Sequence, residues 1–280
     1  MADCSNCPTK GECDSQEDCT IKNNPFNNVK RVIGVMSGKG GVGKSTVSVL
    51  LAIELSEMGY QVGILDADIT GPSIPRLLGL KDKRAGQNEL GILPVKSNDG
   101  ISVISLNLLI ENEQQPVIWR GPIISNTVKQ FWEDVFWGDL DYLIIDMPPG
   151  TGDVALTVMQ SIPISGMLVV SVPQDMVSMI VAKAVNMASE MGIKNIGMVQ
   201  NMSYFECPDC GKQIRIFDDE NIGSYYRQLD IDLLGELPMR LQMAHITDDG
   251  LCVDDDLVKK TMEKVAKVVI DSVKNNKEEK

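Results

Sequence analysis

Short apolar runs alternate with longer amphipathic segments along most of the chain. The short runs are rich in Val, Ile and Leu, which predicts buried strands; we expect them at 32–36, 61–65, 142–145, 167–172 and 196–200, with a last one starting at 233. Apolar positions at helical spacing predict helices over 45–58, 176–191 and 257–273. Strands that alternate with helices indicate an α/β fold, with a mainly parallel sheet and helices on both of its faces.

The first residues lack this alternation. Residues 1–28 are polar and cysteine-rich, with too few apolar side chains for a core, so this segment is a possible metal or cluster site. We expect one domain over 29–273 and a charged tail over 274–280. Within the domain, 81–99 is a polar insertion with no clear period.

Composition and net charge favour some classes of protein and argue against others. Hydrophobic residues make up 43% of the 280 residues and charged residues 23%, which is ordinary for a globular protein. The formal net charge of −13 argues against nucleic acid or an anionic membrane as the main partner. The sequence has neither a membrane-length apolar run nor a start typical of a signal peptide. We therefore expect a cytoplasmic protein without stable membrane association, in which clustered cysteines ligate a metal or cluster.

A phosphate-binding loop lies between the first predicted strand and the first predicted helix. The sequence matches G-x-x-x-x-G-K-[ST] in full and stands in the context that this motif requires. The glycines let backbone N–H groups face phosphates; Lys44 is expected to reach the β- and γ-phosphates and Ser45 to ligate Mg²⁺. This motif predicts ATP and Mg²⁺ bound by Gly38, Lys39, Gly40, Gly41, Val42, Gly43, Lys44, Ser45 and Thr46.

Lys39 makes this loop a deviant form of the motif. In this respect the chain resembles the superfamily that includes MinD, ParA, the arsenite-pump ATPase and the nitrogenase iron protein. The resemblance implies that Lys39 contacts nucleotide phosphate across a dimer interface, and hence a homodimer that sandwiches the nucleotide. A solvated lysine is the alternative on the residues alone.

Acidic residues follow two of the predicted strands, at the edge where parallel sheets bind ligands. An apolar strand ends in Asp146, the Walker B arrangement that holds Mg²⁺ directly or through water. Asp66 and Asp68 follow the strand at 61–65. The resemblance implies that Asp68 orients or activates the attacking water and that Asp66 lies near the Mg²⁺ shell. A turn or cap role is the alternative for both.

Two motifs follow the strand at 196–200. The resemblance implies that Asn201 contacts the adenine, whereas a turn signal is the alternative. Cys207 and Cys210 form a C-x-x-C pair, which supplies half of a tetrahedral metal site or of a cluster's ligands. A symmetric dimer would supply the other half. Zinc and a redox dithiol are the rivals, although the context is not that of a thioredoxin-like unit.

Four more cysteines precede the domain. Cys4, Cys7, Cys13 and Cys19 fall within sixteen residues, which suits a [4Fe–4S] cluster or a zinc ion; an unligated, oxidisable segment is the alternative. Cys252 stands apart and is expected to be structural.

Together the phosphate loop, the acidic motifs, Asn201 and the C-x-x-C pair resemble the Mrp/Nbp-type iron–sulfur cluster carrier ATPases, from residue 29 to the final helix. The resemblance implies a homodimer that holds a [4Fe–4S] cluster between two C-x-x-C pairs. It would deliver the cluster to apo iron–sulfur proteins with slow ATP hydrolysis, after receiving it from a cluster donor.

Two other functions remain open at this point. A positioning ATPase of the MinD/ParA kind would need a basic surface or an amphipathic membrane helix. A zinc-stabilised, nucleotide-binding regulator would differ from an iron–sulfur carrier in holding zinc, not iron, at its cysteines.

Overall fold

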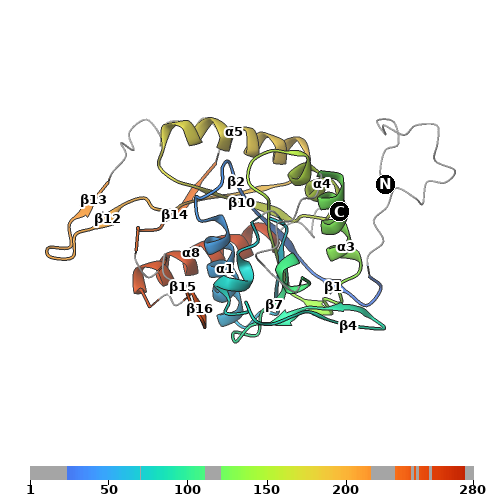
Figure 1. Ribbon diagram of the computed structural model, residues 1–280. Helices are drawn as coiled ribbons and strands as arrows, with labels where there is room; N and C mark the ends of the chain where they lie inside the picture. Colours follow the sequence, from blue (N-terminus) through green and yellow to red (C-terminus); the bar gives the residue numbers. More distant parts are fainter. Residues whose placement is uncertain are drawn as a thin grey trace.

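A sheet of eight strands forms the centre of the molecule (Figure 1). The computed structural model describes residues 24–69, 71–110, 121–215, 231–240, 243, 246–251 and 254–274. The strands of this sheet are β2 (Val32–Ser37), β3 (Val62–Asp66), β6 (Val95–Lys96), β7 (Ser102–Ile104), β9 (Tyr142–Asp146), β10 (Gly166–Ser171), β11 (Asn195–Gln200) and β14 (Leu233–Glu236). They lie in the order β14-β11-β10-β2-β9-β3-β7-β6, and every neighbouring pair is parallel except β6 with β7.

The central strands confirm the mainly parallel sheet. Every residue of β2, β3, β9 and β10 is buried, because each strand has a neighbour on both sides and helices over both faces. Burial on both faces explains why these strands appear in the sequence as continuous apolar runs. All six strands expected from the sequence are present.

Helices cover both faces of the sheet. The helical elements are α1 (Lys44–Glu57), α2 (Ile74–Leu77), the 3-10 helix η3 (Leu106–Leu108), α3 (Gly121–Glu133), α4 (Asp153–Ser161), α5 (Asp175–Glu190) and α8 (Asp256–Lys274). α1 and α8 pack together on one face, and α5 lies on the other (Figure 1). The three predicted helices are present. The sequence analysis did not predict α2, α3 or α4. α2 and α4 have four and nine residues, too few for a clear period, whereas α3 has thirteen residues and was missed.

Small two-stranded sheets lie around the central one. They pair β1 (Asn28–Val29) with β8 (Asp139–Leu140), β4 (Gly86–Asn88) with β5 (Gly91–Leu93), β12 (Phe205–Glu206) with β13 (Gln213–Ile214), and β15 (Ile246–Thr247) with β16 (Gly250–Leu251). The stretch 81–99 therefore contains the β4–β5 hairpin and β6. No residue of β4 or β5 is buried, so these strands lack the apolar alternation that reveals a strand.

The chain order of the strands differs from their order in space. β9 lies between β2 and β3, although it comes much later in the chain. Asp66 and Asp146 consequently occupy paired positions at the ends of neighbouring strands. The loops after β2, β3 and β9 meet at one edge of the sheet, where open α/β folds bind their ligands.

The boundaries of the domain stay predictions. The described elements run from β1 to α8, and residues 1–23 and 275–280 lie outside the described part of the chain.

The hairpin formed by β4 and β5 contacts the body at Gly91. The φ angle of Gly91 is +129°, and an added Cβ would lie 2.1 Å from the carbonyl oxygen of Asp134. We expect Gly91→Ala to lower the free energy of unfolding by about 2–4 kcal/mol in urea titrations, because backbone strain and a backbone clash add. Gly100→Ala is the matched control: φ is +79° but nothing lies within 4 Å, so a loss of about 1 kcal/mol is expected. Equal losses would contradict the close approach.

Candidate functional site

The loop after β2 forms an open cradle at the start of α1. Gly41 and Gly43 have φ angles of +79° and +82°, which glycine adopts without strain. A Cβ added at Gly40 or Gly41 would meet nothing within 4 Å, so no side chain fills the space beside these two residues. The loop borders a cavity of about 290 Å³, lined by Ser37, Lys39, Gly40, Gly41, Gly43, Lys44, Ser45, Thr46, Asp68, Gly71, Ser73, Leu77, Pro149 and Ile246.

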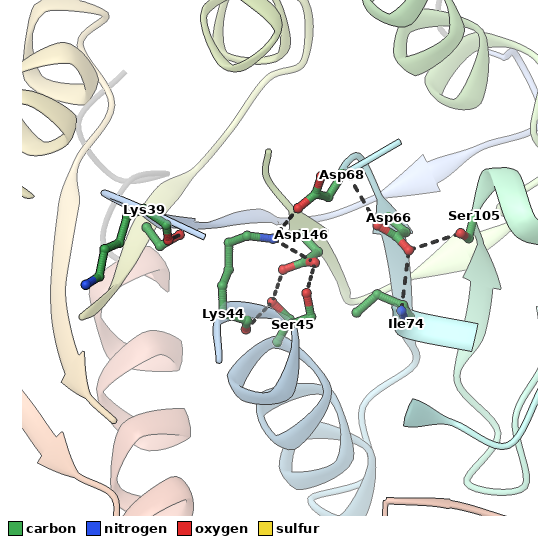
Figure 2. Close-up of polar contacts among 10 residues, drawn as sticks. Lys39, Lys44, Ser45, Asp66, Asp68, Ile74, Ser105 and Asp146 are labelled. Atoms are coloured by element: carbon green, nitrogen blue, oxygen red, sulfur yellow. Dashed lines mark hydrogen bonds and ion pairs between the residues drawn. The ribbon is translucent and has the colours of Figure 1, made fainter. Parts of the chain in front are cut away.

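The carboxylate of Asp146 is the centre of the polar network beneath this cavity (Figure 2). The side chain is fully buried at the end of β9. Lys44 Nζ lies 2.9 Å from Oδ2, Ser45 Oγ donates to Oδ2 at 2.6 Å, and Ser48 Oγ donates to Oδ1 at 2.7 Å. The cation and both hydroxyls come from the first turns of α1, so the buried charge is compensated by one element. The structure thus brings together Lys44, Ser45 and Asp146.

Asp68 faces the same lysine from the loop after β3. Its Oδ2 lies 3.7 Å from Lys44 Nζ, and its side chain is 15% exposed where it lines the cavity. A carboxylate beside the lysine of a phosphate loop is suited to orienting a water molecule. The Asp68 carboxylate therefore lies where its predicted role requires it. The role itself remains a prediction.

Asp66 differs from Asp68 although the two are close in sequence. Asp66 is fully buried and absent from the cavity lining. It accepts hydrogen bonds from Ser105 Oγ at 3.0 Å and from the backbone N–H groups of Ile74 and Asp68 at 3.4 and 3.3 Å. These contacts make it an organiser of the loop that carries Asp68. Its predicted position near Mg²⁺ remains a prediction.

The pKa of Asp66 is raised by its burial and by the neighbouring carboxylate of Asp146. Burial raises the pKa of Asp66 well above its ordinary value, and the Asp146 carboxylate raises it further. Lys44 and the Ser105 hydroxyl lower this pKa without reversing the shift. Asp66 therefore holds a proton more readily than an exposed aspartate, which reduces the cost of placing both carboxyl groups in the core.

Lys39 is directed away from Lys44 and Asp146 (Figure 2). Its ammonium group donates to the side-chain oxygen of Gln174, and its backbone carbonyl accepts from Ser37 Oγ at 3.0 Å. Within one chain Lys39 thus does not join the Asp146 network. A lysine held in this direction is compatible with the predicted contact across a dimer, which stays a prediction.

Asn201 lies against the loop and does not line the cavity. Its amide Nδ2 donates to the carbonyl of Val42 at 2.9 Å, and a Cβ on Gly43 would come within 2.2 Å of that nitrogen. Its Oδ1 is buried and has no hydrogen-bond partner among the residues described. The predicted contact with adenine remains a prediction, and the structure adds a direct link from the end of β11 to the phosphate loop.

Two buried hydroxyl groups of the site were not predicted from the sequence. Ser48 bonds to Asp146, and Ser105 to Asp66, across sequence separations of 98 and 39 residues. Ser48 offers one signal: it lies four residues after Lys44, so it shares the lysine's side of α1. Ser105 follows β7 and offers none, because nothing in the chain indicates which strand lies beside β3.

The C-x-x-C pair lies in the turn of the β12–β13 hairpin, which projects from the body (Figure 1). The N–H of Cys207 donates to Lys212 O at 3.0 Å, and the N–H of Gly211, at φ +70°, donates to Cys207 O at 2.9 Å. Hydrogen bonds from the backbone of Asp209 and Cys210, and from the Cys210 side chain, lower the pKa of the Cys207 thiol. This turn favours the thiolate, the form that ligates metals.

One hairpin offers two thiols. Both cysteines are free thiols, and no cluster of three or more His, Cys, Asp or Glu side chains suited to a metal occurs within the described ranges. The other predicted cysteine ligands, Cys4, Cys7, Cys13 and Cys19, lie outside the described residues, and so does Cys252.

Comparison with known proteins gives consistent matches over nearly the whole domain. A ParA family model described as NUBPL iron-transfer P-loop NTPase matches residues 28–274. The chain is 48% identical over 254 residues to the iron-sulfur cluster carrier protein of Clostridium perfringens, covering 88% of this chain and 89% of that protein. It is 40% identical over 284 residues to the protein of the same name from Methanocaldococcus jannaschii, covering 98% of each.

Solved structures agree on the fold. A nucleotide-binding protein from Archaeoglobus fulgidus, in complex with ADP, superposes with a TM-score of 0.68 at 38% identity, covering 84% of this chain and 88% of that chain. The cell division ATPase MinD of Pyrococcus furiosus has a TM-score of 0.62 at 18% identity, covering 87% and 99%. The second likeness shows the fold alone.

Ser48 is the clearest test of the Asp146 network. We expect Ser48→Ala to lower the free energy of unfolding by about 1–3 kcal/mol, since one oxygen of a buried carboxylate loses its donor. It should also weaken Mg·ATP binding in calorimetric titrations. Ser56→Ala is the matched control, because Ser56 Oγ donates to Asp99 O at 2.9 Å on the exposed side of α1. Wild-type stability and affinity in Ser48→Ala would contradict the network.

Proposed function

The chain belongs to the family of NUBPL-type iron-transfer P-loop NTPases, and from this we propose that it is an ATP-dependent carrier that binds an iron–sulfur cluster and transfers it to apo-proteins. The observation that carries the proposal is the C-x-x-C hairpin. It presents Cys207 and Cys210 as free thiols, beyond the body of a domain with a complete phosphate loop. The names of the relatives, iron-sulfur cluster carrier or transfer protein, support the cargo.

The cargo would be a [4Fe–4S] cluster shared between two copies of the chain. Such a cluster needs four thiolates, and one hairpin offers Cys207 and Cys210. A two-fold dimer would bring the same pair from the second copy, so each chain contributes half of the ligands. The lowered pKa of Cys207 supports a thiolate ready to bind iron.

The nucleotide would be ATP with Mg²⁺. Ser45 and Asp146 offer the hydroxyl and carboxylate oxygens that Mg²⁺ prefers, and they lie 2.6 Å apart. When bound, the ion would neutralise charge on the phosphates. In this proposal Lys44 binds the β- and γ-phosphates, Asp68 orients the attacking water, and Lys39 reaches a phosphate bound by the partner. Slow hydrolysis would then change the geometry of the dimer around the cluster.

A positioning ATPase is the weaker alternative. The MinD likeness is at 18% identity and extends to the fold only. No helix in the part of the chain that the structure describes has the length and apolar character needed to cross a membrane. A cytoplasmic location, and partners limited to cluster donors and apo iron–sulfur proteins, stay predictions of the sequence.

Anaerobic reconstitution with iron and sulfide tests the proposal. We expect the doubly substituted Cys207→Ala/Cys210→Ala protein to lose about one [4Fe–4S] cluster per dimer, because the shared cluster loses all four ligands. Visible absorbance and bound iron, sulfide and zinc are measured for each protein.

Cys252→Ala is the matched control, because it removes one thiol that is expected to be structural. It should keep the wild-type cluster content. Zinc in place of iron in the wild type, or unchanged iron in the double variant, would refute the shared cluster. The chain would then be a P-loop nucleotidase with a structural metal.

A further inference from the structure

The hairpin that carries the cysteines is held to the body by two ion pairs, one from β12 and one from the residue that follows β13. Such short hairpins are marginally stable alone, so their orientation depends on outside contacts. On the β12 side, Arg240 Nη2 donates to Glu206 Oε2 at 2.5 Å, and Glu206 directly precedes Cys207. On the β13 side, Arg215 donates to both carboxylate oxygens of Glu236 at 2.7 and 3.0 Å. Both ion pairs therefore connect the hairpin to residues 236–240.

Arg240 also binds a second carboxylate. Its Nε donates to Asp255 Oδ2 at 2.7 Å. The other oxygen of Asp255 accepts hydrogen bonds from the N–H groups of Leu257 and Val258, at 2.9 and 3.2 Å, at the start of α8. α8 packs along α1, the helix that begins with Lys44. One guanidinium thus joins the hairpin to a helix that lies against the helix of the phosphate loop.

Backbone bonds connect the same segment to the nucleotide site. The N–H of Leu237 donates to Gln200 O at 2.9 Å, and Leu237 O accepts from the N–H of Ser203 at 2.9 Å. Asn201 lies between Gln200 and Ser203 in the chain, and its amide contacts Val42 in the phosphate loop. A continuous series of contacts therefore runs from the phosphate loop, through the end of β11 and residues 236–240, to the residue before Cys207.

We propose that Arg240 is a positioning residue that sets the position of the C-x-x-C hairpin relative to the phosphate loop and carries the nucleotide state to the thiols. The inference rests on the proposed function, in which Cys207 and Cys210 hold the cargo. Arg240, Glu206 and Asp255 have side-chain exposures of 22%, 31% and 18%, so water screens these pairs only in part. The planar fork of arginine engages two carboxylates at once, which the single ammonium of lysine does not reproduce.

The test uses the metal-free, reduced chain and measures the alkylation rate of Cys207 and Cys210 by mass spectrometry. Rates are compared without nucleotide and with Mg²⁺ and a non-hydrolysable ATP analogue. In the wild type we expect the nucleotide to change the rates by about fivefold or more. Arg240→Gln should bring this ratio close to one while its affinity for the analogue stays at the wild-type value. A residue that only stabilised the fold would not separate these two readouts.

Three further variants make the test specific. Glu206→Gln should abolish the ratio like Arg240→Gln, and Arg240→Lys should restore it only in part. Lys267→Gln is the matched control: it removes an ion pair of 2.6 Å with Glu263 on α8, away from the hairpin, and should keep the wild-type ratio.

Two outcomes would overturn the proposal: a wild-type ratio in Arg240→Gln, or wild-type thiols that do not respond to nucleotide. Because no iron is present, the result is independent of the reconstitution experiment. A chain that binds no cluster but still shows the Arg240-dependent ratio would refute the carrier function and leave the coupling intact.

Discussion

A carboxylate buried at the centre of a parallel sheet is the constraint on which the site depends. A charge without partners in that position is costly, so Asp146 requires compensation on both of its oxygens. Lys44, Ser45 and Ser48 supply it, all from the start of α1. The same three contacts connect the start of α1, directly after the phosphate loop, to the end of β9. Stability of the core and shape of the nucleotide site thus have one physical cause.

The phosphate loop and the thiols proposed to hold the cluster lie in different parts of the molecule. The phosphate loop lies at the end of β2, a central strand, whereas the thiols lie on a hairpin that projects beyond β11 and β14 (Figure 1). Any effect of ATP on Cys207 must therefore pass through the residues that connect the phosphate loop to the hairpin. Residues 236–240 are bonded to both ends, through Leu237 to the end of β11 and through Arg240 to Glu206. We therefore propose that these few polar contacts at the sheet's edge carry the coupling, rather than the apolar core.

Sequence patterns predicted the features that are local in the chain. Buried strands show as apolar runs, and Lys44, Ser45 and the C-x-x-C pair belong to short motifs. The insertion of β9 between β2 and β3 could not be predicted, and with it the pairing of Asp66 with Asp146. The sequence placed Asp66 and Asp68 together, but burial separates them: Asp66 organises a loop while Asp68 lines the cavity.

Polar contacts between residues far apart in the chain also could not be predicted from the sequence. Arg240 pairs with Glu206 across 34 residues, and no period or motif marks either one. Exposed strands such as β4 were missed because they bury no face and so show no alternation.

If Asp146 binds the Mg²⁺ of ATP as proposed, then any effect of ATP on transfer of the cluster requires this buried carboxylate. The most direct measurement is the rate at which cluster-loaded protein activates an apo iron–sulfur enzyme, with and without Mg·ATP, in the wild type and in Asp146→Asn. We expect ATP to change the rate in the wild type only, while both proteins hold the same amount of cluster. An equal response to ATP in the two proteins would contradict it.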